Sequence, residues 1–137
     1  MCLCAGLVFH ATGGGAIEIG IGAINSKGEV VGQYFGTDYV QNAFIRDGAG
    51  NLTDFAIKGS QLNTASSVNG TGQVVGSWEE NNSPFDTLAL ERDPSGKIRT
   101  FSAPESNLQT NATGVNNNGI ITGSWVDSNF VSHGFVR

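Results

Sequence analysis

Three aromatic residues, Tyr34, Trp78 and Trp125, each stand two residues after a glycine in three similar segments of the chain. Flat rings presented in register are a surface on which proteins hold sugar rings. Each segment alternates as a strand does, so that Ile121 and Trp125 share one face, and that face is apolar in every copy. The pattern favours packing of these rings between neighbouring sheets, with a glycan-binding row as the alternative.

Acidic residues recur where a loop is expected after the aromatic residue. Glu79, Glu80 and Asp86 lie there in the middle copy, and Asp38 and Asp127 in the other two. Such loops gather at one end of a repeat structure, where carboxylates can contact a cation or a basic partner. Solvated loop charges are the favoured interpretation, and Glu79, Glu80 and Asp127 are kept beside the aromatic row as candidate ligand contacts.

Arginine also recurs, because Arg46, Arg92 and Arg137 hold one position in three copies. We expect each stem to pack and each guanidinium to meet a carboxylate or carbonyl of the next repeat. The functional alternative is a ring of positive charge that faces a central channel and binds an anion.

The groups that catalysis or metal binding requires are sparse. The two histidines are His10 and His133, and neither has a nearby acid at an equivalent position in the other repeats. Ser132 precedes His133, and adjacent strand residues point to opposite faces. Cys2 and Cys4 are too close in sequence to join distant parts of a fold or to form a metal site without further ligands. We therefore predict no catalytic residue, no metal and no cofactor.

These residues are placed by an internal repeat. The segment from Ala23 to Tyr34 returns near Asn69 and near Asn116, and Asn25 and Asn69 are 44 residues apart and Asn69 and Asn116 are 47 apart. A second block beginning at Ala43 returns 46 residues later. We divide the single domain 1–137 into a partial repeat (1–20), repeat 1 (21–63), repeat 2 (64–110) and a truncated repeat 3 (111–137).

Each repeat is predicted to hold four short strands with turns between them. In repeat 1 these are a segment ending at Asn25, then 29–35, 42–46 and 51–57. The Asn-x-x-Gly turns supply residues that tolerate a positive φ. No long window shows helical spacing, so the fold class is all-β. A four-stranded antiparallel unit of this length is typical of a β-propeller blade.

The two ends of the chain fall inside repeats. Gly6 to His10 resembles a third strand, and Ala16 to Ile19 is expected to supply a fourth strand that repeat 3 lacks. A propeller needs about 4 to 8 blades. Three blades therefore predict a half propeller completed by oligomerisation, part of a longer array, or an open β-solenoid.

Composition excludes several classes. Charged residues are 14% and hydrophobic residues 39%, with 20 glycines, which is not the composition of a disordered tail or a coiled coil. The net charge of −5 disfavours nucleic acid as a partner. No segment is apolar for long enough to span a membrane, and Met1 to Val8 lacks the basic start of a signal peptide.

From about residue 21 to the end, the chain resembles the bacterial extracellular HAF repeats. The matching residues are Ile24-Asn25, Gly28, Val30 and Gly32, with their counterparts in the later copies, and His133-Gly134-Phe135. The resemblance implies a secreted or surface-associated, propeller-like protein without a defined activity.

Three functions remain open at this point. The first is a non-enzymatic, extracellular or surface binding scaffold that self-associates as a homo-oligomer and holds a glycan or protein ligand. The second is a propeller-type enzyme or lectin with its site at the loop end. The third is a self-assembling structural subunit whose exposed edge accepts a strand from the next copy.

Overall fold

The computed structural model describes residues 18–80, 86–104, 106 and 108–137. Within these residues every regular element is a strand, which confirms the all-β class. The expectations for Cys2, Cys4, His10 and the segment from Gly6 to His10 lie outside the described residues. The strands are β1 (Glu18–Ile24), β2 (Val30–Phe35), β3 (Gln41–Arg46), β4 (Leu52–Phe55), β5 (Ser60–Val68), β6 (Val74–Glu80), β7 (Thr87–Arg92), β8 (Ile98–Phe101), β9 (Gln109–Val115), β10 (Ile121–Val126) and β11 (Ser132–Val136).

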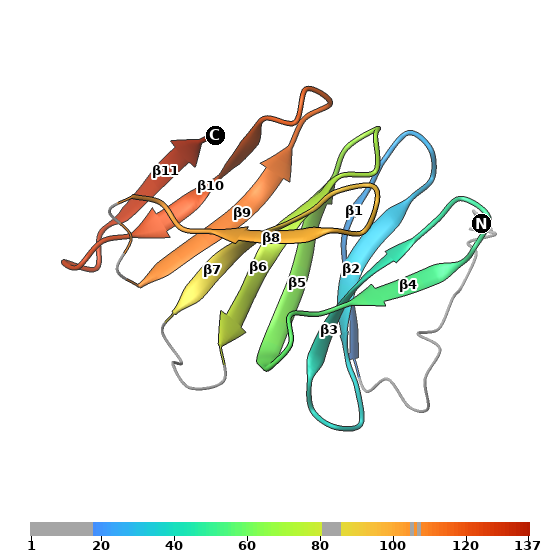
Figure 1. Ribbon diagram of the computed structural model, residues 1–137, viewed down its shortest axis with the longest axis horizontal. Coiled ribbons are helices and arrows are strands. Elements are labelled where there is room, and N and C mark those ends of the chain that lie inside the picture. Colours follow the sequence, from blue (N-terminus) through green and yellow to red (C-terminus); the bar gives the residue numbers. More distant parts are fainter. Residues whose placement is uncertain (1–17, 81–85, 105, 107) are drawn as a thin grey trace, which may run out of the picture.

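The strands form three antiparallel series, which we call unit 1 (β1–β4), unit 2 (β5–β8) and unit 3 (β9–β11). They fan out from right to left in Figure 1. One parallel pair joins each unit to the next, Gln41 with Leu62 and Thr87 with Gln109, so all belong to one mixed sheet. Within the described residues β1 pairs only with β2, and β11 only with β10, so this sheet is open.

Most predicted strands lie within two residues of the observed ones, but the assignment of one segment was wrong. Ala16 to Ile19 was expected to complete repeat 3 as its fourth strand. Instead Ile19 belongs to β1 and pairs with Tyr34 of β2. Residues 16 and 17 are outside the described part.

The turn between the first and second strands of each unit is built on an asparagine. In the middle copy, Asn69 Oδ1 accepts hydrogen bonds from the backbone N–H groups of Thr71 and Gln73, at 3.0 Å each. Gly72 completes the turn at φ +88°, a conformation that costs a residue with a Cβ about 1 kcal/mol or more. Local side-chain bonding and glycine freedom therefore explain the Asn-x-x-Gly spacing.

The same asparagines link the units. Asn25 Nδ2 donates to the backbone oxygen of Asn69 at 2.8 Å, and Asn69 Nδ2 donates to that of Asn116 at 2.9 Å. We call these bonds the asparagine ladder. Each side chain thus uses its oxygen within its own turn, and its nitrogen donates both to a side chain of that turn and to the backbone of the next unit.

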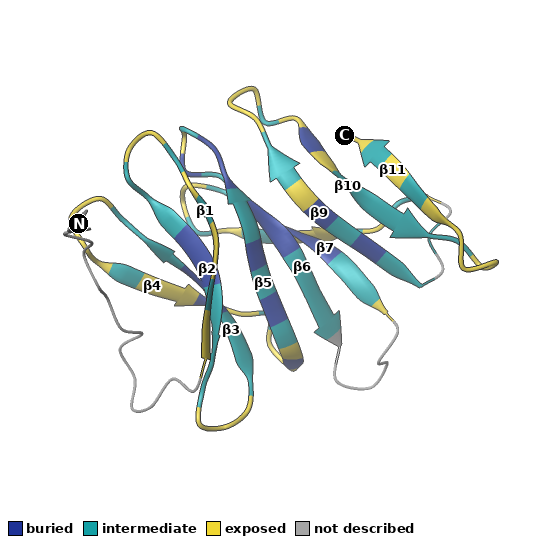
Figure 2. Cartoon of the chain, turned by 180° about the vertical axis from the view of Figure 1, so that it is seen from behind, coloured by how far each residue is buried: buried dark blue, intermediate teal, exposed yellow. Residues whose placement is uncertain are grey.

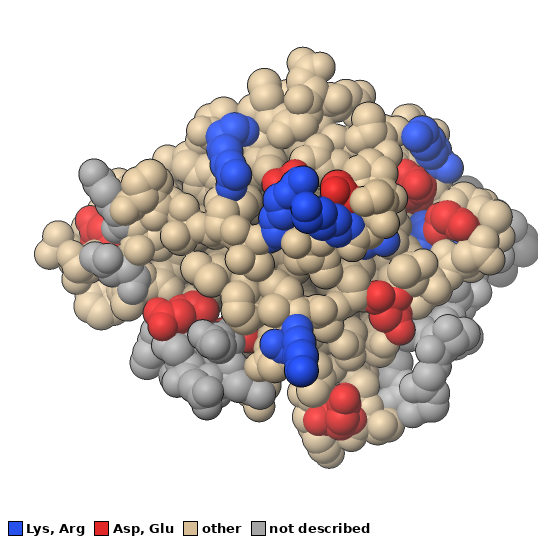
Figure 3. Space-filling model, viewed as in Figure 1, with Lys and Arg blue, Asp and Glu red and all other residues tan. Residues whose placement is uncertain are grey.

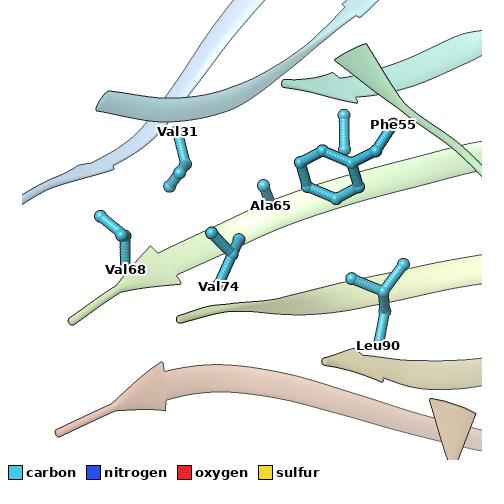
Figure 4. Packing of buried hydrophobic residues seen from close by; sticks show 7 residues of the cluster. Val31, Phe55, Ala65, Val68, Val74 and Leu90 are labelled. Carbon is cyan, nitrogen blue, oxygen red and sulfur yellow. The ribbon is translucent and has the colours of Figure 1, made fainter. Parts of the chain in front are cut away.

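Units 1 and 2 pack face to face over a hydrophobic cluster (Figure 4). Unit 1 contributes Val31, Ala43 and Phe55, and unit 2 contributes Ala65, Val68, Val74 and Leu90. Each of these side chains is at most 8% exposed. Burying such side chains contributes about 1.5–3 kcal/mol for each large one.

Units 2 and 3 repeat this packing with the opposite face of unit 2. Val75 and Ala89 of unit 2 meet Ala112 and Ile121 of unit 3. Phe101 and Phe135 close the cluster edge to face, with ring centroids 5.9 Å apart at 88°. Buried residues therefore lie on the strands between the two ends of the sheet, and β1 and β11 have none (Figure 2).

Gly76 allows β5 and β6 to approach closely. A Cβ built on it would lie 1.9 Å from the backbone oxygen of Thr64, beside the irregularity in pairing between Ala65 and Ser67. No side chain fits there. The glycine two residues before Trp78 is thus fixed by the neighbouring backbone.

Candidate functional site

The aromatic row occupies one register position in the three units. Tyr34 pairs with Ile19, Trp78 with Asn63, and Trp125 with Thr110. Their surroundings nevertheless differ. Trp78 packs against the cluster between units 1 and 2, and its Nε1 is buried without a hydrogen-bond partner among the described residues.

Tyr34 is held at the edge of unit 1 by a carboxylate. Its hydroxyl donates to Asp54 Oδ2 at 2.9 Å. Burial and this bond to Asp54 raise the pKa of Tyr34 to about 12. Below pH 10 the phenol is neutral in both folded and unfolded chains, so the bond stabilises the fold fully.

Between pH 10 and about 12 the unfolded chain loses the Tyr34 proton while the folded chain keeps it, so the free energy of unfolding should fall. The variant Tyr34→Phe should show a smaller fall over this interval. Urea denaturation at a series of pH values measures both slopes, and Tyr39, which is present in both proteins, cancels in the comparison. Equal slopes would contradict the assignment.

Trp125 forms a small array with two polar side chains of unit 3. Its ring stacks on that of His133, with centroids 4.3 Å apart and planes at 21°. His133 Nε2 in turn lies 3.1 Å from Asp127 Oδ2. The backbone N–H of Val131, and then His133, lower the pKa of Asp127. The predicted candidates Trp125 and Asp127 are therefore brought together through His133, whose acid partner sequence reasoning missed.

Two members of the acidic loop set do not lie where they were predicted, whereas Asp38, Asp86 and Asp127 do lie outside the strands. Glu79 and Glu80 belong to β6, where Glu79 pairs with Thr87 and Glu80 with Ser60, so they are strand residues. Asp127 does begin a loop, and its Oδ1 accepts the N–H groups of Asn129 and Val131. Within the described residues no three His, Cys, Asp or Glu side chains come together in a way that could hold a metal ion.

Arg92 and Arg137 contact the preceding unit rather than the next one. The Arg92 guanidinium carbon lies 5.3 Å from the centroid of Phe55, and that of Arg137 lies 4.2 Å from Phe101. Arg92 Nη1 also donates to the carbonyl of its own neighbour Asp93. The expected bond to a carboxylate or carbonyl of the next repeat is therefore wrong for Arg92, and cation–π contact between units replaces it.

Two loop-tip aromatics were missed by sequence reasoning. Tyr39 and Phe130 precede β3 and β11 by two residues and are each 78% exposed. Both have a left-handed backbone, with φ of 60° and 63°. A recurring aromatic two residues before the third strand was the available signal, and Phe85 has the same spacing in the middle copy but lies outside the described residues.

Two hollows accompany these features. One, of about 250 Å³, lies beside Phe130 and is also lined by Leu108, Gln109, Val126 and Ser132. The other, a shallow groove of about 520 Å³, runs along the first and second strands of all three units, and its lining includes Gln33, Thr64, Ser77, Asn111 and Ser124. The residues that line this groove are all uncharged.

Charge does not concentrate on the face shown in Figure 3, where basic and acidic side chains are scattered among uncharged ones. In the described ranges no helix exists that has the length and apolar character for crossing a membrane. A scan against protein families and a search of curated proteins found no match to the chain.

Proposed function

We propose that the chain is a propeller-like binding scaffold that self-associates and works without catalysis, outside the cell or on its surface. Four-stranded antiparallel series packed face to face, as units 1 and 2 are, support blades of a propeller. The extracellular placement rests on the resemblance to HAF repeats. His133 already contacts Asp127 and the ring of Trp125. We therefore assign this histidine a role in shaping the loop end rather than in catalysis.

The observation that carries the proposal is the pair of exposed loop-tip aromatics. A non-glycine residue with a left-handed backbone lowers the free energy of unfolding by about 1 kcal/mol or more. An exposed ring buries too little surface to offset this cost. Packing between units does not explain them, because unit 2 covers the adjoining face of unit 1 and Tyr39 is still 78% exposed. Their use is therefore contact with a ligand.

Glycan is the ligand class that the surroundings of Phe130 favour. The hollow beside it combines apolar walls with the polar side chains of Gln109 and Ser132. A few polar groups on a mainly apolar surface give a ligand both contact area and orientation. Because aromatic rings lie at the same place in units 1 and 3, one extended ligand chain can contact both of these sites on the protein.

The variants Phe130→Gly and Tyr39→Gly test this directly. Glycine keeps the left-handed backbone without strain, so both proteins should be at least as stable as the wild type. We expect the wild type to bind on a glycan array and each variant to lose about tenfold in affinity, as expected for a contributing interface aromatic.

Thr100→Ala, an exposed position on β8, is the matched control and should bind as the wild type does. An array without bound glycan would contradict the glycan ligand. Unchanged affinity in both glycine variants would contradict the loop tips as the binding surface.

A further inference from the structure

One face of β1 is apolar and uncovered. Ile19, Ile21 and Ile24 are 37%, 57% and 68% exposed. Three isoleucines on one strand at the end of the sheet form an apolar patch of the kind that marks an interaction surface. The equivalent strands of units 2 and 3 show what this face contacts inside the sheet.

The corresponding face is buried in units 2 and 3. Ile21 pairs with Gly32 just as Ala65 pairs with Gly76 and Ala112 with Gly123. Ala65 is fully buried against unit 1, and Ala112 is 1% exposed against unit 2. By register, the exposed face of β1 is therefore the face that each later unit packs against the unit before it.

The complementary face is uncovered at the other end of the sheet. Units 1 and 2 receive the next unit with Val31, paired to Ile45, and Val75, paired to Glu91. In unit 3 the same pair is Thr122 and Val136, and Val136 is 74% exposed. The two ends thus present the two halves of an interface that the chain forms twice internally.

The asparagine ladder has an open end at the same place. Asn116 Oδ1 accepts the N–H groups of Asn118 and Ile120, as in the other turns. Aspartate makes such turns equally well in this protein, since Asp47 Oδ1 accepts from Ala49 and Asn51. Asparagine differs from aspartate in having an amide donor. Asn25 and Asn69 each donate to a backbone oxygen of the next unit. Within the described residues, Asn116 Nδ2 has no such acceptor in another unit.

We propose that a second copy of this chain docks across both ends, with the β10–β11 face of each copy on the β1 face of the other. This proposal rests on the self-associating scaffold proposed above. The amide of Asn116 in one copy donates to the backbone oxygen of Asn25 in the other, and Ile21 and Ile24 are covered by Thr122 and Val136. Two such contacts close a symmetric ring of six units, within the about 4 to 8 of a propeller.

Sedimentation velocity of the full chain over a wide concentration range tests the proposal. We expect a dimer for the wild type. Ile21→Glu places a charge in the apolar contact, and Asn116→Asp removes the ladder donor but keeps its turn, so each should raise the dimer Kd at least about tenfold. Thr100→Glu, a charge at an exposed position on β8 of the middle unit, should leave the Kd unchanged.

A wild type that is monomeric at all concentrations would overturn the proposal. So would a dimer that Ile21→Glu and Asn116→Asp leave intact. Glycan binding by the monomeric Ile21→Glu variant tests the proposed ligand site independently of dimerisation, because the loop tips do not take part in docking.

Discussion

Replacing Gly76 with alanine should remove most of the free energy of unfolding. The added Cβ would lie 1.9 Å from the oxygen and 2.7 Å from the carbonyl carbon of Thr64, which are backbone atoms that cannot turn aside. Relief requires β5 and β6 to separate, and these strands carry residues of both hydrophobic clusters. We expect a loss of more than about 4 kcal/mol, in the range reserved for severe disruptions, measured by urea denaturation.

Gly59 offers the matched control. Its φ is +88°, but a Cβ there would meet no atom within 4 Å. Gly59→Ala should therefore cost only the backbone strain, about 1–2 kcal/mol. If the two substitutions cost the same, the close approach of β5 to β6 is not what fixes Gly76.

Asn69→Asp should be the second most destabilising change, through the ladder. Asn69 is 4% exposed, and its Nδ2 donates to Asn116 O and to Gln73 Oε1, both at 2.9 Å. Aspartate keeps the turn but points a carboxylate oxygen at two acceptors. Its first oxygen keeps the donors of Thr71 and Gln73, but the second oxygen is left buried without a donor, which costs at least about 1–3 kcal/mol. Thermal or urea unfolding at neutral pH would show this loss.

The pH dependence of Asn69→Asp supplies a further check. Below about pH 4 the new carboxyl is protonated and can donate one hydrogen bond, so the difference from the wild type should shrink. In the wild type, the Asn116 amide donates to no acceptor in another described unit. Asn116→Asp should therefore unfold almost as the wild-type monomer does. A large stability loss in Asn116→Asp would contradict this account of the ladder.

Local patterns in the sequence were sufficient to predict most of the strands and turns. Alternation placed Trp78 on the packed face, and Asn-x-x-Gly spacing located the first turn of each unit. The same local rules failed at Glu79 and Glu80, because charge suggested a loop where backbone pairing with Thr87 and Ser60 extends β6. Backbone pairing partners far along the chain decide strand length there.

Other features of the candidate site depend on contacts that no local pattern contains. The bond between the Asn25 amide and the Asn69 carbonyl joins residues 44 apart. The cation–π contact of Arg92 likewise depends on where Phe55 of unit 1 lies. Tyr39 and Phe130 were missed because neither composition nor alternation reveals a left-handed backbone at a non-glycine residue.

The position of unit 2 between the two hydrophobic clusters has a consequence for folding. Units 1 and 3 each have a cluster only with unit 2, so the described sheet behaves as a linear series of nearest-neighbour couplings. Either terminal unit can open by itself and leave one cluster intact. Opening of the middle unit removes both couplings at once, so cooperative unfolding is controlled from the centre of the chain.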